Sequence, residues 1–392
     1  MDTLVLDTIH GGTEIAQHLR SMGHEVDAID VYRGKKWAVK NVYDVLIAPV
    51  HLDPGHPLLT IRAEKMISHH EAVRWILEGR TPHPMVEITG AQGKTTTACA
   101  LASLMGGPGI LHTSQGTFSF PDRNLLWRKS ITPASTIAAA LAAHERRGWL
   151  IAEESLGVTG AGDIGVITSD RDYPIANKKK SALIEKLKSL QRMPEVVTIP
   201  EIKFDHQHSH SIDEVTQCKG RVCEYRLNSH QGEFSNSLLE LAAYRIPLRL
   251  ATTIACLLRI DPKPLERFQP IEGRMALYRR GGVVIVDNAN SGTDLASTIE
   301  AAQYARTHES TSGLTLVIGE ISRTICEGFS ATDVERAIQA TKPDRVILVG
   351  ERVALLKTEI DCHFAASLEE GLEIAQKITP QGSIVLAVKM WR

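Results

Sequence analysis

The sequence predicts an α/β protein of two to three domains built around parallel sheets. Short apolar segments alternate with segments of helical periodicity along most of the chain, and this alternation is typical of strand–helix–strand units. At about 150 residues per domain, a length of 392 residues accommodates two to three domains. The hydrophobic content of 43% and the charged content of 23% exclude a disordered or collagen-like chain.

The first block of the chain predicts a small α/β domain that begins like half of a nucleotide-type fold. Strands are expected at residues 4–6, 25–31 and 45–50. Helices are expected at residues 13–22 and 63–78, and a tight turn at residues 8–12 joins the first strand to the first helix. Residues 79–84 contain Gly79, Pro82 and Pro84 and are interpreted as a linker.

Two further blocks show the same alternation. The second block predicts strands at residues 85–89, 149–152 and 164–168, and helices at residues 95–105 and 238–259. Residues 203–237 are polar, histidine-rich and weakly periodic, so they form either a surface insertion or a small β-element. The third block predicts strands at residues 283–287, 315–319, 345–350 and 384–388, separated by helices.

Charge and cysteine usage give expectations about partners and compartment. The 44 basic and 46 acidic residues give a formal net charge of −2, and aromatic residues are only 5%, so no nucleic-acid partner is expected. No apolar stretch approaches the roughly 18 residues of a membrane span, and the first residues do not resemble a signal peptide. We therefore expect a cytoplasmic protein without a membrane partner. Its scattered cysteines, which include no CxxC pair, are expected to be free thiols; they are Cys99, Cys218, Cys223, Cys256, Cys326 and Cys362.

Residues 88–97 (ITGAQGKTTT) predict a phosphate-binding loop between a strand and a helix. Gly90 and Gly93 allow backbone N–H groups to converge on a phosphate, and the start of the helix adds its partial positive charge. Lys94 is expected to reach the β- and γ-phosphate oxygens, and the Thr95 hydroxyl is suited to Mg²⁺. The loop has the shorter GxxGKTT form, because Ile88 replaces the first glycine of the full pattern.

Two later signals accompany this loop. The strand predicted at residues 149–152 ends in Glu153 and Glu154, and a carboxylate at the carboxyl end of a parallel strand can enter the ligand crevice and bind Mg²⁺. Further along the chain, residues 272–275 (EGRM) are followed by residues 287–292 (DNANSG). Each of these segments alone is a weak signal.

In order and spacing, the motifs together resemble those of the Mur ligase superfamily, which comprises ATP-dependent ligases that include the peptidoglycan amino-acid ligases and folylpolyglutamate synthetase. Residues 90–96 are similar to the family's GTxGKTT loop, and residues 153–156 to its E-x-S-S element. Residues 273–275 are similar to its G-R-M/E element, and residues 287–292 to its D-Y-A-H-N-P element. The resemblance covers residues 85–392.

The resemblance implies a fold, cofactors and a site. It implies a small N-terminal substrate-side domain at residues 1–80, a P-loop ATP-binding domain at 81–270 and a Rossmann-like ligase domain at 271–392. ATP and Mg²⁺ are the implied cofactors, with Lys94 and Glu153 as catalytic residues and Thr95 and Glu153 as metal ligands. The implied nucleotide-binding residues are Gly90, Gln92, Gly93, Lys94, Thr95, Thr96, Arg274, Asp287 and Asn290.

Departures from the family pattern indicate a divergent branch. Residues 168–173 (TSDRDY) lack the histidine that helps hold a second Mg²⁺ in the family, and the run 178–180 (KKK) contains no clear counterpart of its carbamylated lysine. The segment 6–12 (LDTIHGG), the compact length and residues 287–290 resemble a methanogen branch. In that branch ATP activates a propionate of a nickel tetrapyrrole, and closure onto a macrocycle carbon completes a cofactor.

Other interpretations remain open at this point. Within the ligases, the alternative is an amide-forming peptide or polyglutamate ligase. Outside them, the candidates are a P-loop regulatory NTPase and an NAD-binding reductase suggested by residues 10–12 and Asp30. The histidines at 206, 208 and 210 are interpreted as part of a solvated loop, because their spacing matches no zinc pattern. A tetrapyrrole would need a cationic rim for its carboxylates, with candidates at Arg33, Lys35, Lys36 and Lys178–Lys180. The sequence does not indicate an oligomeric state.

Overall fold

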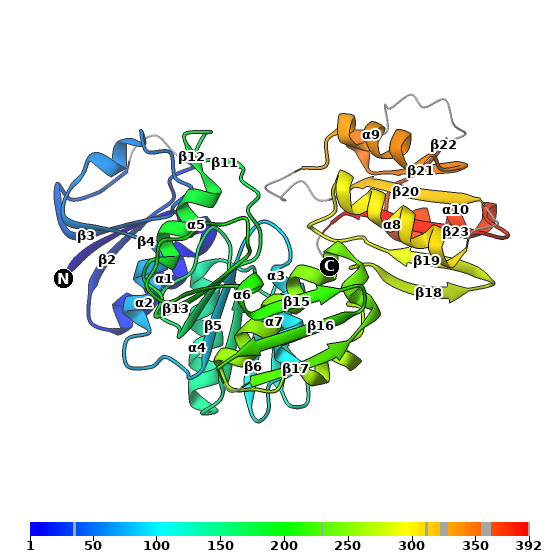
Figure 1. Ribbon diagram of the computed structural model, residues 1–392. Helices are drawn as coiled ribbons and strands as arrows, with labels where there is room; N and C mark the ends of the chain where they lie inside the picture. The colour runs from blue at the N-terminus through cyan, green and yellow to red at the C-terminus, as the bar shows by residue number, and fades with distance from the viewer. Residues whose placement is uncertain (34–36, 229, 310–312, 322–327, 354–361, 391–392) are drawn as a thin grey trace. The chain divides into compact units, whose positions relative to one another are not determined.

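The computed structural model describes residues 1–392 except 34–36, 229, 310–312, 322–327, 354–361 and 391–392 (Figure 1). The chain divides into two compact units. Unit 1 comprises residues 1–239 and 246–267, and unit 2 comprises residues 240–245 and 268–392. The α/β class expected from the sequence is confirmed in both units.

Unit 1 begins with a four-stranded parallel sheet in the order β2-β1-β3-β4. Its strands are β1 (Asp2–Leu6), β2 (Glu25–Ile29), β3 (Val42–Ala48) and β4 (Arg62–Ser68). Helices α1 (Thr13–Ser21) and α2 (His69–Ile76) pack on this sheet through buried side chains such as Ile15 and Val73. The carboxyl ends of all four strands lie at one edge, where ligands of parallel sheets usually bind.

The prediction of a helix at residues 63–78 is wrong for the first half of this segment. Arg62–Ser68 is the edge strand β4, and the helix begins only at His69. Ser68 and Glu71 form a capping box, in which the Ser68 side chain accepts from the Glu71 N–H and Glu71 accepts from the Ser68 N–H. This box sets the start of the helix, and the charged residues of the exposed edge strand resemble a solvated helical face in the sequence.

The second sheet of unit 1 has eight strands in the order β14-β13-β10-β5-β9-β6-β7-β8. The strands from β14 to β6 are parallel, and β7 and β8 continue as antiparallel neighbours. They are β5 (Met85–Thr89), β6 (Gly109–Thr113), β7 (Gly116–Phe120), β8 (Asn124–Trp127), β9 (Trp149–Glu153), β10 (Ile164–Ile167), β13 (Glu195–Thr198) and β14 (Ser209–Ser211). Strand β5, which leads into the phosphate loop, therefore lies between β10 and β9.

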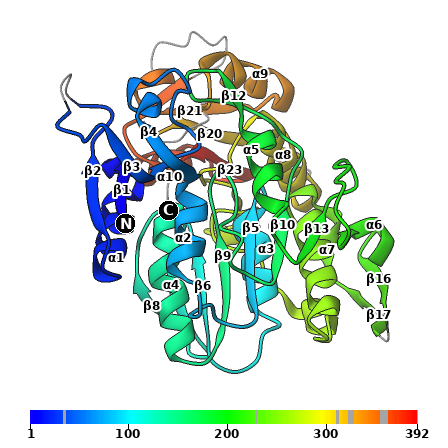
Figure 2. The ribbon, with the colours of Figure 1, turned by 90° about the vertical axis from the view of Figure 1, so that its left-hand side faces the viewer.

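Three helices accompany the second sheet, and one of them, α4, packs against helix α2 of the first sheet. The three helices are α3 (Lys94–Ala102), α4 (Pro133–Glu145) and α5 (Ala182–Leu190), with the short hairpin β11 (Pro174–Ile175) and β12 (Lys180–Ser181) before α5. Helices α2 and α4 run side by side (Figure 2). Ala72 of α2 and Ile137 of α4 belong to one buried cluster together with Val5 of β1. This shared core fixes the small N-terminal sheet on the central one.

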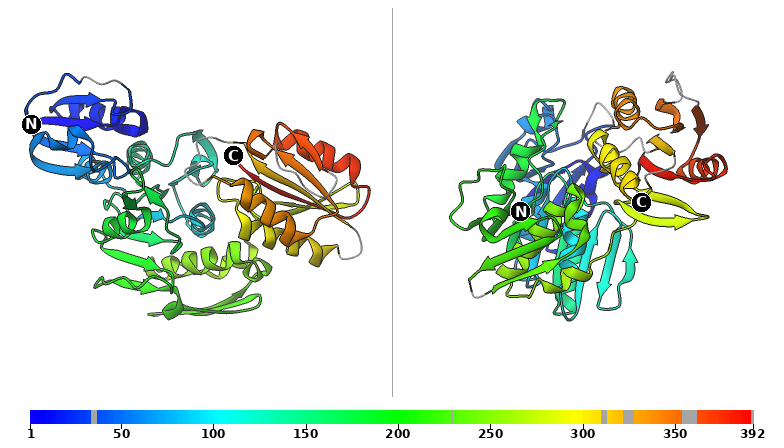
Figure 3. Two further views of the ribbon diagram at one scale, coloured as in Figure 1. Left: turned by 90° about the horizontal axis from the view of Figure 1, so that it is seen from above. Right: turned by 45° about the vertical axis from the view of Figure 1, so that its right-hand side comes forward.

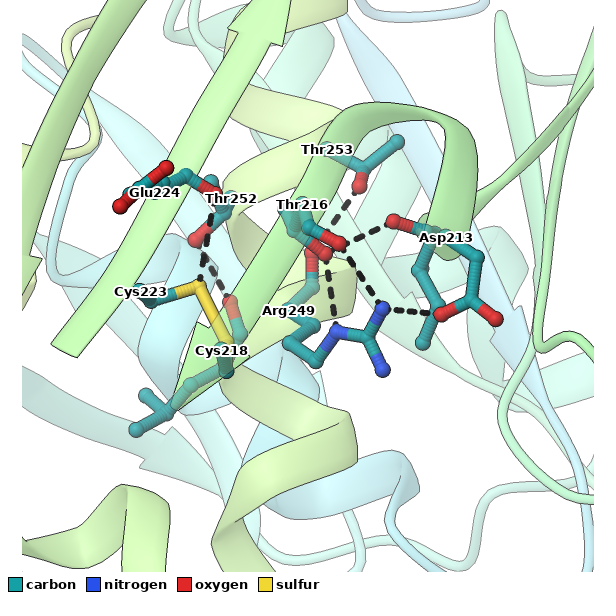
Figure 4. Close-up of a disulfide and its surroundings, with 10 residues drawn as sticks. Asp213, Thr216, Cys218, Cys223, Glu224, Arg249, Thr252 and Thr253 are labelled. Atoms are coloured by element: carbon teal, nitrogen blue, oxygen red, sulfur yellow. Dashed lines mark hydrogen bonds and ion pairs between the residues drawn. A yellow bond between two sulfur atoms is a disulfide. The ribbon is translucent and has the colours of Figure 1, made fainter. Parts of the chain in front are cut away.

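The polar segment at residues 203–237 includes a small β-element, as one of its two interpretations expected. Strands β15 (Thr216–Lys219), β16 (Val222–Leu227) and β17 (His230–Ser235) form an antiparallel sheet after the short helix α6 (Ile212–Val215). Helix α7 (Ala242–Leu257) follows, and its Arg249 side chain donates to the Thr216 hydroxyl and pairs with Asp213 (Figure 4).

The expectation that all cysteines are free thiols is wrong for one pair. Cys218 and Cys223 form a disulfide across the β15–β16 hairpin (Figure 4). The two residues are direct partners in the antiparallel register, and their Cα atoms lie 4.1 Å apart. A spacing of five residues therefore brings the sulfur atoms together, although the sequence contains no CxxC pair.

Unit 2 is a six-stranded sheet in the order β18-β19-β23-β20-β21-β22, parallel except for β18. Helix α10 (Leu368–Ile378) packs on one face, and α8 (Leu295–His308) and α9 (Ala331–Thr341) lie on the other (Figures 1 and 3). The strands are β18 (Ala276–Arg280), β19 (Val283–Asp287), β20 (Leu314–Glu320), β21 (Arg345–Val349), β22 (Cys362–Ala365) and β23 (Ser383–Lys389). In the described part of the chain, every helix is too short or too polar to cross a membrane.

Candidate active site

The phosphate loop occupies the turn between β5 and α3. Gly90 has φ 144° and Gly93, at the start of α3, has φ 81°, so both adopt conformations that favour glycine. A Cβ on Gly90 would lie 2.1 Å from the Thr168 hydroxyl oxygen. The loop therefore passes so close to the end of β10 that only glycine fits at position 90.

Lys94, Thr95 and Glu153 converge beside this loop. Strand β9 pairs with β5 so that Glu153 lies opposite Ile88, and its carboxylate comes out at the edge where the loop begins. The Thr95 hydroxyl donates to Glu153 Oε2 at 2.7 Å, and Lys94 Nζ lies 3.7 Å from Oε1. The Lys94 and Glu153 side chains are 14% and 3% exposed, so the ion pair is shielded from solvent.

Ser114 joins this group and was not identified from the sequence. It follows strand β6, which pairs in parallel with β9, and its backbone N–H donates to Glu153 Oε2 at 3.1 Å. Its hydroxyl lies 3.2 Å from the Thr95 hydroxyl. Three oxygen-bearing side chains therefore meet at one point, and such a hard donor set fits Mg²⁺. The only available signal in the sequence was the position of Ser114 directly after a buried strand.

The other side of the loop is supported by the residues after β10. The Ser169 hydroxyl accepts hydrogen bonds from the backbone N–H groups of Ala91 at 2.9 Å and Gln92 at 3.4 Å. Thr168 donates its hydroxyl to the Gln92 carbonyl at 2.5 Å. In the sequence, residues 168–173 were noted only because they lack the family's histidine. In the structure, Thr168 and Ser169 form hydrogen bonds with the phosphate loop.

Glu154 is separated from this site. It is fully buried, and its carboxylate accepts a hydrogen bond from the Thr136 hydroxyl at 3.0 Å. It lies beside Glu87, whose carboxylate accepts hydrogen bonds from the backbone N–H groups of Thr159, Gly160 and Gly162. Burial, reinforced by the neighbouring Glu87 carboxyl, raises the pKa of Glu154 well above its ordinary value. Adjacent residues of a strand face opposite sides, so Glu153 and Glu154 have different surroundings.

In unit 2 the structure brings the two later motifs together. Residue 276 pairs with Asp287 across β18 and β19, and the Asn290 side-chain amide donates to the Gly273 carbonyl at 2.6 Å. Asp287 accepts from the Ala289 N–H at 3.1 Å. Asp287 also lines a cavity of about 610 Å³ together with residues of α10, among them Leu368 and Leu372. Arg274 lies next to Gly273 on the same turn, and its carbonyl accepts from the Tyr244 hydroxyl.

The candidate cations for a substrate rim have different surroundings. Lys179 Nζ lies 2.7 Å from the Asp53 carboxylate, and Lys180 donates to the Val50 carbonyl at 3.1 Å. These two lysines thus connect the β11–β12 hairpin to the loop after β3. Lys178 and Arg33 are exposed, and Lys35 and Lys36 lie outside the described residues.

A P-loop sheet with an acid on the neighbouring strand, followed by a second α/β unit that carries the GRM and DNAN segments, defines a protein of the Mur ligase type. A bifunctional folylpolyglutamate synthase/dihydrofolate synthase solved with Mn, AMPPNP and L-glutamate has a TM-score of 0.59, with 12% identity over 82% of this chain and 91% of that chain. MurF ligase from Thermotoga maritima in complex with ADP has a TM-score of 0.54, with 13% identity over 88% of this chain and 90% of that chain. The predicted fold family is confirmed.

Sequence comparison narrows the assignment. A family model described as the C-terminal domain of coenzyme F430 synthetase CfbE matches residues 277–390. The coenzyme F(430) synthetase of Methanosarcina acetivorans is 31% identical over 99% of this chain and 98% of its own length. The chain therefore belongs to the coenzyme F430 synthetase family, and the branch expected from the sequence is confirmed.

Proposed function

We propose that this protein is an ATP-dependent cyclo-ligase that acts on a nickel tetrapyrrole. ATP phosphorylates a propionate carboxylate of the seco-acid precursor. A carbon of the macrocycle then attacks the acyl phosphate, which closes a carbocyclic ring and releases phosphate. Membership of the coenzyme F430 synthetase family supports the substrate. The convergence of Lys94, Thr95 and Glu153 at adjacent strand ends is the observation that supports the ATP step.

The loop residues have roles that follow from their surroundings. The N–H groups of Ala91 and Gln92, now bonded to Ser169, are the donors that would turn to phosphate oxygens. Lys94 Nζ, held 3.0 Å from the Gly90 carbonyl, would neutralise charge on the transferring phosphoryl group. Gln92, Gly93 and Thr96 would complete the cradle.

Thr95 and Glu153, with Ser114 beside them, would hold Mg²⁺. When bound, this ion would offset the negative charge of the phosphate oxygens. In the ground state, Glu153 keeps the Thr95 hydroxyl and the Lys94 ammonium oriented toward the loop. Such preorganisation of Lys94 and Thr95 would lower the entropic cost of positioning these two groups for phosphoryl transfer.

The remaining parts of the assignment are also proposals. We divide the chain into a substrate-side domain at residues 1–80, an ATP-binding domain at 81–270 and a ligase domain at 271–392. Arg274, Asp287 and Asn290 would bind ATP from the ligase domain, with Asp287 at the ribose. The tetrapyrrole would occupy a cleft between the first two domains, with Arg33 and Lys178 among the cations at its rim. We also expect the protein to be cytoplasmic.

A substrate panel tests the proposal against amide formation. ADP release is measured with the tetrapyrrole seco-acid, with UDP-linked peptides plus amino acids, and with folate plus glutamate. Release that depends on the tetrapyrrole alone is expected. Release that depends on an amino acid as second substrate would replace the proposal with a peptide or polyglutamate ligase. Release without any carboxylate substrate would indicate a P-loop regulatory NTPase.

A further inference from the structure

Three neighbouring strand ends of the N-terminal sheet bring Asp7, His10, Tyr32 and His51 together. Asp7 and His10 follow β1, Tyr32 follows β2 and His51 follows β3. The strand order β2-β1-β3 reverses direction at β1, and the crevice at such a reversal is where open parallel sheets bind ligands. Neither the phosphate loop nor the ligase motifs account for this cluster.

Asp7 is the centre of the cluster and is fully buried. Its Oδ1 accepts from the N–H groups of Ile9 and His10 at 3.1 and 3.0 Å. Its Oδ2 accepts from His10 Nδ1 at 2.8 Å, from His51 Nε2 at 3.0 Å and from the Tyr32 hydroxyl at 3.2 Å. Burial alone would raise the pKa of Asp7, but the hydrogen bonds from His51 and His10 outweigh it, and the net shift is downward. Asp7 is therefore a carboxylate that orients two imidazoles.

The backbone at Asp7 is itself unusual. Its φ of 71° places a residue with a side chain in the left-handed region. Such conformations are costly and concentrate at functional sites, because the surrounding structure must hold them. In this conformation the Asp7 carboxylate caps the turn at residues 8–12 and also orients the ring of His10.

The His10 ring is oriented so that its Nε2 atom can accept a proton. Because Nδ1 donates to Asp7, the neutral ring carries its lone pair on Nε2, and among the described residues no group bonds to that atom. The side chain is 47% exposed. The rings of Tyr32 and His51 contact it edge-on, with centroid distances of 5.4 and 5.0 Å, and fix its plane. A carboxylate, an oriented imidazole and an open Nε2 are the parts of a general base.

The turn that carries His10 adjoins the central sheet. A Cβ on Gly11 would lie 2.6 Å from Ala134 Cβ and 3.5 Å from the Thr132 hydroxyl, at the start of α4. The segment before α4 is bonded to the end of β9, because Ser155 N–H donates to the Ile131 carbonyl at 2.9 Å. Ser155 comes two residues after Glu153. The turn thus packs on the start of α4, which is bonded through Ile131 to the strand end that contributes the phosphate-site carboxylate.

We propose that His10 is the general base of ring closure, with Asp7 and His51 as positioning residues. This inference rests on the proposed function. The macrocycle carbon bonds to the acyl carbon of the acyl phosphate, the C–O bond to the phosphate breaks, and phosphate leaves with that electron pair. The proton of the attacking carbon passes to His10 Nε2 and then to solvent. Atoms and charge balance without a further reactant.

The same three residues could also be considered as a metal site, since their ligand atoms lie within 4.8 Å of one another. The hydrogen bonds favour the base. All five donors around Asp7 would have to be rearranged before its carboxylate and the nitrogen atoms facing it could bind an ion. Metal binding is therefore an outcome that the experiment must be able to detect.

The test separates activation from ring closure. Wild type and His10→Gln are incubated with ATP, Mg²⁺ and the seco-acid in the presence and absence of hydroxylamine, which traps an acyl phosphate as the hydroxamate. His10→Gln should form hydroxamate at the wild-type rate, while closed product should form about 10²–10⁴-fold more slowly, the usual contribution of a general base. Asp7→Asn, which tolerates the left-handed conformation, should show the same pattern. Hydroxamate formation also reports that each variant is folded.

His83→Gln is the matched control, because His83 Nδ1 lies 3.0 Å from Asp163 in a similar pair on an exposed surface. It should form closed product at the wild-type rate. Equal loss of hydroxamate and product in His10→Gln, or unchanged closure, would overturn the inference alone. One Zn²⁺ or Ni²⁺ bound per chain and lost in His10→Gln and His51→Gln would overturn it in favour of a metal site. Wild type that forms no hydroxamate from the tetrapyrrole would overturn the proposed function as well.

Discussion

The Thr95 hydroxyl donates a hydrogen bond of 2.7 Å to the Glu153 carboxylate, which joins the first turn of α3 to the end of β9. The two residues are 58 positions apart in the sequence. They meet because β9 pairs in parallel with β5, the strand that leads into the phosphate loop. The hydroxyl and the carboxylate are the two oxygen ligands expected for Mg²⁺. Their contact predicts that Glu153, and not the adjacent Glu154, is the metal ligand.

Glu153→Gln should raise the Mg²⁺ concentration needed for half-maximal activity by more than Glu154→Gln does. Only Glu153 contacts Thr95 and Lys94, whereas Glu154 is buried beside Glu87. Mg²⁺ titrations of ADP release by both variants measure the difference. A larger effect in Glu154→Gln would mean that the metal site uses the other face of β9.

Glu154→Gln also has an expected effect on stability. The raised pKa of Glu154 means that the folded state holds a proton more tightly than the unfolded state. The free energy of unfolding therefore decreases as the pH rises above the unfolded pKa of about 4.3. Glu154→Gln removes the titrating group and should reduce this decrease. Urea unfolding at pH 5 and pH 8 measures it, and an unchanged pH dependence would contradict the raised pKa.

Lys94→Ala should reduce turnover on the order of 10³-fold while the protein remains folded. The side chain contacts the Gly90 carbonyl and Glu153 rather than the apolar core, so its loss removes charge stabilisation and little packing. Steady-state ADP release, with circular dichroism as the check on folding, measures the effect. Turnover near the wild-type value would contradict the role of the loop in phosphoryl transfer.

Comparison of Gly90→Ala with Gly79→Ala separates the effect of backbone strain from the effect of a steric clash with a neighbouring residue. Both glycines have positive φ, but a Cβ on Gly79 meets no atom within 4 Å, whereas one on Gly90 meets Thr168. Gly79→Ala should cost about 1 kcal/mol of stability and preserve ATP affinity. Gly90→Ala should also weaken ATP binding, by about tenfold or more, because Thr168 and the loop must move apart. Equal ATP affinities in the two variants would show that the contact with Thr168 is unimportant.

His69 and His70 predict a loss of stability in mild acid. Burial lowers the pKa of each to about 4, although each donates to a carbonyl, that of Leu6 or Ser155. Between pH 6.5 and 4 the unfolded chain binds these protons and the folded chain does not, so the free energy of unfolding falls with falling pH. The loss approaches 2–3 kcal/mol per histidine, on the order of 1.4 kcal/mol per pKa unit. Urea unfolding from pH 7 to 4.5 measures it.

His70→Asn should be less stable than the wild type at pH 7, because it loses the bond to Ser155, but its stability should change less with pH. Urea unfolding of both proteins over the same pH range measures the difference. A wild-type free energy of unfolding that is constant from pH 7 to 4.5 would contradict the buried, neutral state of both histidines.

The sequence was sufficient for the sheet strands whose residues are buried on both faces. Residues 85–89 and 149–152 are continuous apolar or β-branched runs with one acid, and both strands appear close to the expected bounds. It was insufficient for β4, because an exposed edge strand carries charges at positions that also fit a helix. The sequence was also insufficient for β6 to β8. These short strands are antiparallel neighbours, and no helix lies between them in the sequence to indicate where each strand ends.

The candidate site follows the same division. Lys94, Thr95 and Glu153 were predictable because a local motif and a strand end identify them. Ser114 and Ser169 were not assigned a role, since single serines after strands have no distinguishing pattern. The grouping of Asp7 with His51 depends on strand order, which alternation along the chain does not specify. The Cys218–Cys223 disulfide likewise depends on hairpin register.

The central claim is that the chain closes a ring on a nickel tetrapyrrole at the expense of ATP. The most direct measurement is the mass of the product after incubation with ATP, Mg²⁺ and the seco-acid precursor. A product lighter than the precursor by one water, formed together with ADP and phosphate and absent with Lys94→Ala, is the expected result. An unchanged tetrapyrrole, with ADP released only when an amino acid or a UDP-linked peptide is supplied, would contradict it.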